Sequence, residues 1–100
     1  MSFEGGSLSA SLIAAVGDDP ALLSELRRAF LESADRQLDM LSGAVDASAW
    51  QTALWRMKGL AGSFGAVSVI ALVEEAEKLA PGDAKILRRL RSALSLLSVD

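Results

Sequence analysis

The residues best suited to chemistry in this chain lie close together, between positions 55 and 66. This segment has the sequence Trp-Arg-Met-Lys-Gly-Leu-Ala-Gly-Ser-Phe-Gly-Ala. Lys58 offers a positive charge, Trp55 offers a large aromatic surface, and the glycines at 59 and 62 leave space beside the backbone. The chain contains no histidine and no cysteine, so it has neither an imidazole nor a thiolate nucleophile. The segment therefore indicates recognition of a partner rather than catalysis.

The composition predicts one small helical domain that spans residues 1–100. Hydrophobic residues make up 51% of the chain, and the net charge of −3 provides no general attraction to nucleic acid. Apolar runs such as 69–73 are far shorter than a membrane span, and the N-terminus lacks the basic start of a secretory signal. We therefore expect a cytoplasmic protein with no nucleic-acid or membrane partner.

Apolar periodicity and turn residues predict five helical segments. They are a short helix at about 8–16 capped by Ser7, a helix from Pro20 to Gly43 capped by Asp19, a helix from Asp46 to Phe64, a helix at about 66–79, and a helix after Asp83. The fourth segment carries Val69, Val73, Ala76 and Ala80 at helical spacing. The fold class that follows is all-α: an antiparallel up-down four-helix bundle with a short additional N-terminal helix.

The third predicted helix has two unequal sides. At about 100° per residue its apolar stripe centres near Met57, and Trp55 lies roughly 160° from that centre. We expect Trp55 to face solvent and Trp50 to enter the core. The other positions on or beside the Trp55 side are Gln51, Thr52, Arg56, Lys58, Gly59, Gly62 and Ser63.

The sequence also allows purely structural explanations of these residues. Trp55 could lie beneath the first helix or the N-terminal tail, against Phe3. Gly59 and Gly62 could serve only to let helices pack closely. Lys58 alone could be an ordinary solvated charge.

The segment resembles the signature of histidine-containing phosphotransfer (HPt) domains, roughly His-x-Leu-Lys-Gly and then, after a short gap, Gly-Ala. Trp55 stands at the histidine position. The resemblance extends along most of the chain through Asp18-Asp19-Pro20, Phe30, Asp46, Gly65-Ala66, Val69, Val73 and Glu77.

The resemblance implies a bundle in which an exposed histidine receives a phosphoryl group from the aspartyl phosphate of a response-regulator receiver domain. It implies further that Lys58 lies near the phosphoryl oxygens and that Gly59 opens space beside the acceptor. Gly62 and Ser63 would then fall on or near the docking face. The implied partners are a receiver domain and a hybrid histidine kinase.

Replacement of the acceptor histidine by Trp55 predicts that phosphotransfer is lost. The indole nitrogen delocalises its lone pair into the ring and acts only as a hydrogen-bond donor. Ser63 or Thr52 could form a phosphate ester, but an ester does not readily pass the group on, and no general base is expected nearby.

Three interpretations of Trp55 follow. It could anchor a receiver domain that still docks, it could belong to a remodelled interface with a second copy or a kinase, or it could mark simple decay of the acceptor site. We favour docking of a receiver without catalysis or cofactor, by a monomer or weak homodimer. The alternative is a structural or homodimerising bundle that uses the Trp55 face for a non-receiver partner.

Other chemistries fit the sequence less well. A bundle-type metal site needs Glu-x-x-His pairs, so Glu74, Glu75 and Glu77 are interpreted as a solvated helix face, with Glu74 four residues before Lys78. The arginines at 88, 89 and 91 are likewise interpreted as a solvated face.

Overall fold

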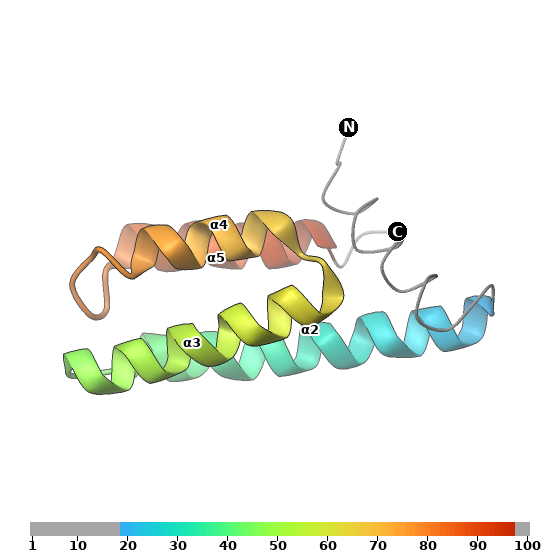
Figure 1. Ribbon diagram of the computed structural model, residues 1–100, viewed down its shortest axis with the longest axis horizontal. Helices are drawn as coiled ribbons and strands as arrows, with labels where there is room; N and C mark the ends of the chain where they lie inside the picture. The colour runs from blue at the N-terminus through green and yellow to red at the C-terminus, as the bar shows by residue number, and fades with distance from the viewer. Residues whose placement is uncertain (1–18, 98–100) are drawn as a thin grey trace.

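The computed structural model describes residues 19–97, so the short helix predicted at about 8–16 lies outside the described residues. The described chain forms α2 (Pro20–Ser42), α3 (Ala47–Phe64), α4 (Val67–Ala76) and α5 (Ala84–Leu97). Figure 1 shows that the chain reverses direction at each connection, and that α2 and α3 lie on one side with α4 and α5 on the other. The backbones of α2 and α3, α3 and α4, α4 and α5, and α5 and α2 are neighbours, and no two of these four helices are backbone neighbours across a diagonal. The predicted all-α, antiparallel four-helix bundle is confirmed.

Aspartate side chains begin three of these helices, as the sequence predicted. The carboxylate of Asp19 accepts from the backbone N–H groups of Ala21 and Leu22, at 3.1 and 3.2 Å. The Asp46 carboxylate accepts from the N–H of Ala49 at 2.8 Å, and that of Asp83 accepts from Ile86 at 3.0 Å. Each bond satisfies a first-turn N–H that has no partner within its helix.

Gly65 ends α3 in the left-handed conformation, at φ 70°. The Gly65 N–H donates to the carbonyl of Gly62, and the Ala66 N–H donates to that of Ala61 at 2.9 Å. This paired arrangement satisfies the last carbonyls of the helix and needs a residue that accepts positive φ. The chain then turns directly into α4, so α3 and α4 form an antiparallel hairpin.

The fourth helix is shorter than the sequence predicted. It ends at Ala76 instead of about residue 79, and Ala80, expected on its apolar stripe, is exposed. The N–H groups of Lys78 and Leu79 donate to carbonyls only three residues back, which tightens the chain out of the α-helix. The indole Nε1–H of Trp50 also donates to the carbonyl of Ala76, at 3.2 Å. The carbonyl of Ala76, the last residue of α4, is therefore also hydrogen-bonded to a side chain of α3.

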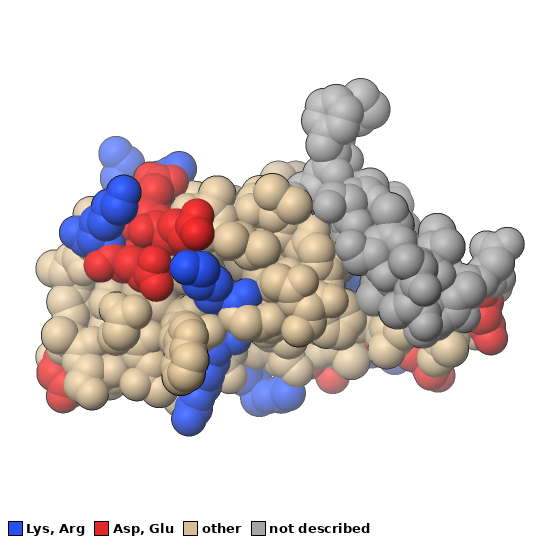
Figure 2. Space-filling view, in the orientation of Figure 1, with Lys and Arg blue, Asp and Glu red and all other residues tan. Residues whose placement is uncertain are grey.

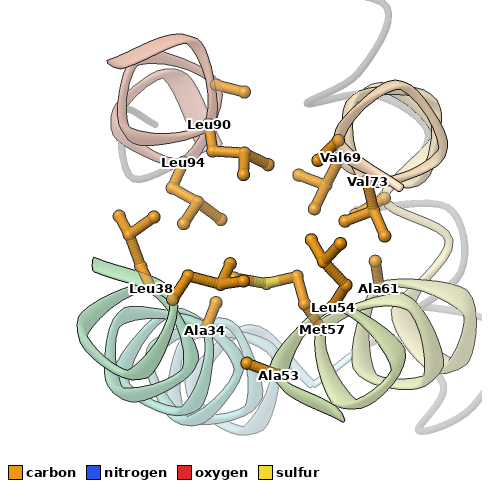
Figure 3. Packing of buried hydrophobic residues seen from close by; sticks show 14 of the residues in the cluster. Ala34, Leu38, Ala53, Leu54, Met57, Ala61, Val69, Val73, Leu90 and Leu94 are labelled. Atoms are coloured by element: carbon orange, nitrogen blue, oxygen red, sulfur yellow. The ribbon is translucent and has the colours of Figure 1, made fainter. Parts of the chain in front are cut away.

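One hydrophobic cluster fills the space among the four helices. Figure 3 shows Leu38 of α2, Leu54 and Met57 of α3, Val73 of α4 and Leu90 of α5 around this interior, and all five are at most 1% exposed. Phe30 and Phe64 join α2 to α3 by a tilted ring contact with centroids 5.0 Å apart. Within residues 19–97, no helix has both the length and the apolar character to cross a bilayer.

Candidate functional site

The two tryptophans of α3 lie on opposite sides of the helix. Trp50 is 3% exposed, and its ring nitrogen bonds to α4, whereas Trp55 is 72% exposed. Figure 3 shows the labelled α3 residues Leu54, Met57 and Ala61 directed into the bundle. The prediction that Trp55 faces outward and Trp50 inward is confirmed, whereas the first helix and the N-terminal tail, beneath which Trp55 could have lain, are outside the described residues.

The predicted site residues all lie on the outward side of α3 or along its edge. Lys58 is half-buried, and the others are exposed: Gln51, Thr52, Trp55, Arg56, Gly59, Gly62 and Ser63. They lie between residues 51 and 63 of one helix, over about three and a half turns, and the inward side of that helix is fixed in the core. The surface is therefore held by a rigid element rather than by a loop.

The glycines of this surface are not needed for packing. A Cβ atom placed on Gly59 or Gly62 would meet nothing within 4 Å outside the helix's own backbone. The interpretation that these glycines let neighbouring helices approach is therefore wrong. Each position lowers the stability of the helix by about 1 kcal/mol relative to alanine. The space that they leave opens toward solvent, next to Trp55.

Lys58 is ion-paired, which the sequence did not predict. Its Nζ lies 3.5 Å from a carboxylate oxygen of Glu74 and 3.8 Å from one of Glu77, both on the neighbouring α4 hairpin arm. The sequence paired Glu74 with Lys78 instead, but α4 ends before Lys78, so that pair no longer shares a helix. The cation beside Trp55 is thus balanced by two carboxylates.

Ser63 is the hydroxyl closest in sequence to the two glycines, and its proton is already engaged. Its Oγ donates to the backbone carbonyl of Gly59 at 3.0 Å, one turn earlier. Such a bond holds the side chain against its own helix. The hydroxyl is therefore not activated by a base, and the carboxylates of Glu74 and Glu77 are paired with Lys58.

The charges of the α3–α4–α5 side gather away from the two glycines. Arg89 of α5 donates to both carboxylate oxygens of Glu75, at 2.8 and 3.0 Å, and these hydrogen bonds lower the pKa of Glu75 below its ordinary value. Figure 2 shows acidic and basic side chains clustered over the C-terminal half of α4, with an uncharged surface over the C-terminal half of α3 and the start of α4. Val67, the first residue of α4, is 58% exposed and adds an apolar side chain to this uncharged surface.

Two hollows in the surface lie elsewhere. One of about 500 Å³ is lined by α2 and α5, and one of about 810 Å³ is lined by α4 and α5. Neither is lined by a residue of α3. The Trp55 surface thus offers an exposed ring with open space on its own helix, which suits contact with another protein better than capture of a small molecule.

A comparison with known families matches the model described as "Hpt domain" to residues 25–99. The chain therefore belongs to the HPt domain family. Members of this family are phosphotransfer modules of two-component phosphorelays, where they interact with response regulators and histidine kinases. No curated protein and no solved structure matches the chain.

Proposed function

We propose that this HPt-family chain docks a response-regulator receiver domain through the outward side of α3 and does not carry phosphate itself. The observation that supports the proposal is the exposed indole of Trp55, which the resemblance to the family signature puts at the acceptor position. The fold and the open helix surface of the family are retained around a side chain that is no nucleophile.

Loss of phosphotransfer follows from the chemistry of the available groups. Transfer between an aspartyl phosphate and a histidine uses an imidazole lone pair as the nucleophile. The indole nitrogen of Trp55 lacks an available lone pair, and the chain has no histidine at any position. The Ser63 proton is bonded to its own helix, so the hydroxyl is not activated by a base.

Docking of a protein is supported by the combination of a rigid aromatic ring and open backbone. Tryptophan is among the residues most enriched at binding hot spots, because one ring buries a large area with little loss of side-chain freedom. The space above Gly59 and Gly62 lets a partner's atoms come close to the helix beside that ring. The ring is therefore proposed as the central anchor of the interface.

Calorimetric titration with receiver domains tests the proposal. We expect one-to-one binding to a receiver, and we expect Trp55→Ala to weaken it about thirtyfold, as loss of a hot spot of about 2 kcal/mol does. The matched control is Leu96→Ala on α5, which removes an apolar side chain that is 62% exposed from the helix diagonally opposite α3 in the bundle. The control should leave the affinity unchanged.

The competing interpretation gives a different result in the same experiment. If no receiver binds and sedimentation shows a dimer that Trp55→Ala dissociates, then the surface serves self-association and the proposal is wrong. Equal loss of receiver affinity in the Trp55 and Leu96 variants would also contradict the assignment of Trp55 as the anchor.

Incubation with a phosphorylated receiver tests the absence of transfer. We expect no label on this chain, and we expect Trp55→His to acquire an acid-labile label, since it places an imidazole on the same surface. Stable, transferable label on the unsubstituted chain would refute the proposed loss.

A further inference from the structure

We propose that the outward side of α3 selects the unphosphorylated form of its receiver partner. This inference rests on the proposed docking and adds the state of the partner that is bound. The observation behind it is the ion pairing of Lys58, the residue that the family resemblance places next to the phosphoryl oxygens.

Lys58 is ion-paired with Glu74 of α4 and with Glu77, which directly follows that helix. Its Nζ lies within 4 Å of both Glu74 and Glu77, and the Glu77 side chain is 29% exposed. If Lys58 turned to a phosphoryl group, it would leave these two negative charges without their cation. Each such pair is weak on its own, but both would be lost together.

A phosphoryl group would also bring its own negative charge toward those carboxylates. Phosphorylation of an aspartate puts about 1.5 to 2 negative charges on the phosphoryl oxygens and removes the single charge of the carboxylate, so the receiver gains about one negative charge at neutral pH. At the edge of a protein surface, charges of like sign within one Debye length, about 10 Å at 0.1 M salt, repel appreciably. An unphosphorylated receiver meets the same surface without this repulsion.

Apart from Arg56, the other groups of the surface offer phosphoryl oxygens only uncharged donors, as on Gln51 and Thr52. Trp55 has a single N–H, and the Ser63 hydroxyl proton is bonded to Gly59. Arg56 makes no ion pair within residues 19–97, but it lies about 100° around the helix from Trp55 and therefore at the rim. A phosphoryl group against the indole would lose water without gaining equivalent hydrogen bonds.

The test is calorimetric titration of one receiver in two states, untreated and activated with beryllofluoride as a phosphoryl mimic. We expect the activated receiver to bind about three- to tenfold more weakly at low salt, and we expect this ratio to shrink as salt is raised. Activation also changes the receiver itself, so the decisive quantity is how the ratio responds to variants of this chain.

The double variant Glu74→Gln, Glu77→Gln frees Lys58 and should bring the ratio of the two affinities close to one. The matched control is Glu75→Gln, which removes a carboxylate of the same helix that pairs with Arg89 instead of Lys58. It should leave the ratio as it is in the unsubstituted chain.

Three outcomes would overturn the inference. A ratio that the double variant leaves unchanged, or that Glu75→Gln changes equally, would show that the Lys58 pairs do not set the selection. Tighter binding of the activated receiver than of the untreated one would mean that the surface selects the opposite form. The proposed docking would survive any of these results. If neither state of any receiver binds, the docking and this inference both fail.

Discussion

At the scale of single residues, α3 carries two tryptophans with opposite duties. Trp50 is a structural residue whose ring is buried and whose Nε1–H bonds to Ala76, whereas the ring of Trp55 contributes little to the core. We therefore expect Trp55→Ala to change the free energy of unfolding by less than about 0.5 kcal/mol, as exposed substitutions usually do. Trp50→Ala should lower it by about 3–5 kcal/mol. Urea unfolding followed by circular dichroism measures both changes.

The outcome that would contradict this division is a large loss of stability in Trp55→Ala. Fluorescence offers an independent check, since these are the only two tryptophans in the chain. Trp55→Phe should leave an emission typical of a buried indole, and Trp50→Phe should leave one typical of a solvated indole. If a receiver docks, quenching or a blue shift should appear in the variant that retains Trp55.

At the scale of the helix, the two glycines on the outward side of α3 make the helix less stable than alanines would. Gly59→Ala and Gly62→Ala should each raise the free energy of unfolding by about 0.5–1 kcal/mol, because alanine is the better helix former and the new Cβ meets no neighbour. If the glycines hold space for a partner, the same substitutions should weaken receiver binding. Thermal unfolding and calorimetric titration of the same variants measure the two effects.

Gly65→Ala is the control for these glycine substitutions. Gly65 has φ 70° at the end of α3, a conformation that disfavours any residue with a Cβ atom. Its replacement should destabilise the chain by about 1–2 kcal/mol. If Gly59→Ala and Gly62→Ala stabilised the helix and left the affinity unchanged, then the open space above α3 would have no role in docking.

The pairing of α4 with α5 gives a prediction about pH. The hydrogen bonds from Arg89 are the main reason that the pKa of Glu75 lies below its ordinary value of 4.5. A lowered pKa in the folded state stabilises the fold above the unfolded value, and this contribution disappears as the pH falls through the folded value. Carbon-13 NMR titration of Glu75 should show the lowered value. Arg89→Leu should move it back toward 4.5, and Arg88→Leu should not.

The helix boundaries show which features sequence patterns predict and which they do not. The starts of α2, α3 and α5 depend on aspartates within three residues of the N–H groups that they bond, so local spacing was sufficient. At the end of α4, the carbonyl of Ala76 accepts from the nearby Leu79 N–H and also from Trp50, which lies 26 residues earlier in the chain, so local spacing reports only part of this boundary. Apolar periodicity predicts that a helix continues for as long as apolar residues recur. It therefore placed Ala80 on the apolar stripe of α4, although the helix ends before that residue.

At the scale of the whole molecule, the site was predictable where it depends on one helix and not where it depends on two. The outward position of Trp55 follows from the angular count along α3 alone. The partners of Lys58 depend on the register of α3 against α4, which the Gly65–Ala66 turn fixes and which no spacing within either helix reports. The charge state of the surface therefore emerged only from the packed bundle.

Because docking and core residues occupy opposite sides of α3, stability and affinity should be separable across the molecule. Leu90 and Ile86 of α5 are at most 1% exposed, and α5 lies diagonally across the bundle from α3, on the far side of the core from the Trp55 surface. Leu90→Ala should lower the free energy of unfolding by about 2–5 kcal/mol, and the milder Ile86→Val by about 0.5–1.5 kcal/mol. At a temperature where each variant remains folded, receiver affinity should stay within about twofold of the unsubstituted chain, since additive behaviour is normal for distant sites. A loss of affinity in the folded Ile86→Val variant would mean that the interior is coupled to the Trp55 surface, and that the partner recognises the packing of the whole bundle and not one side of one helix.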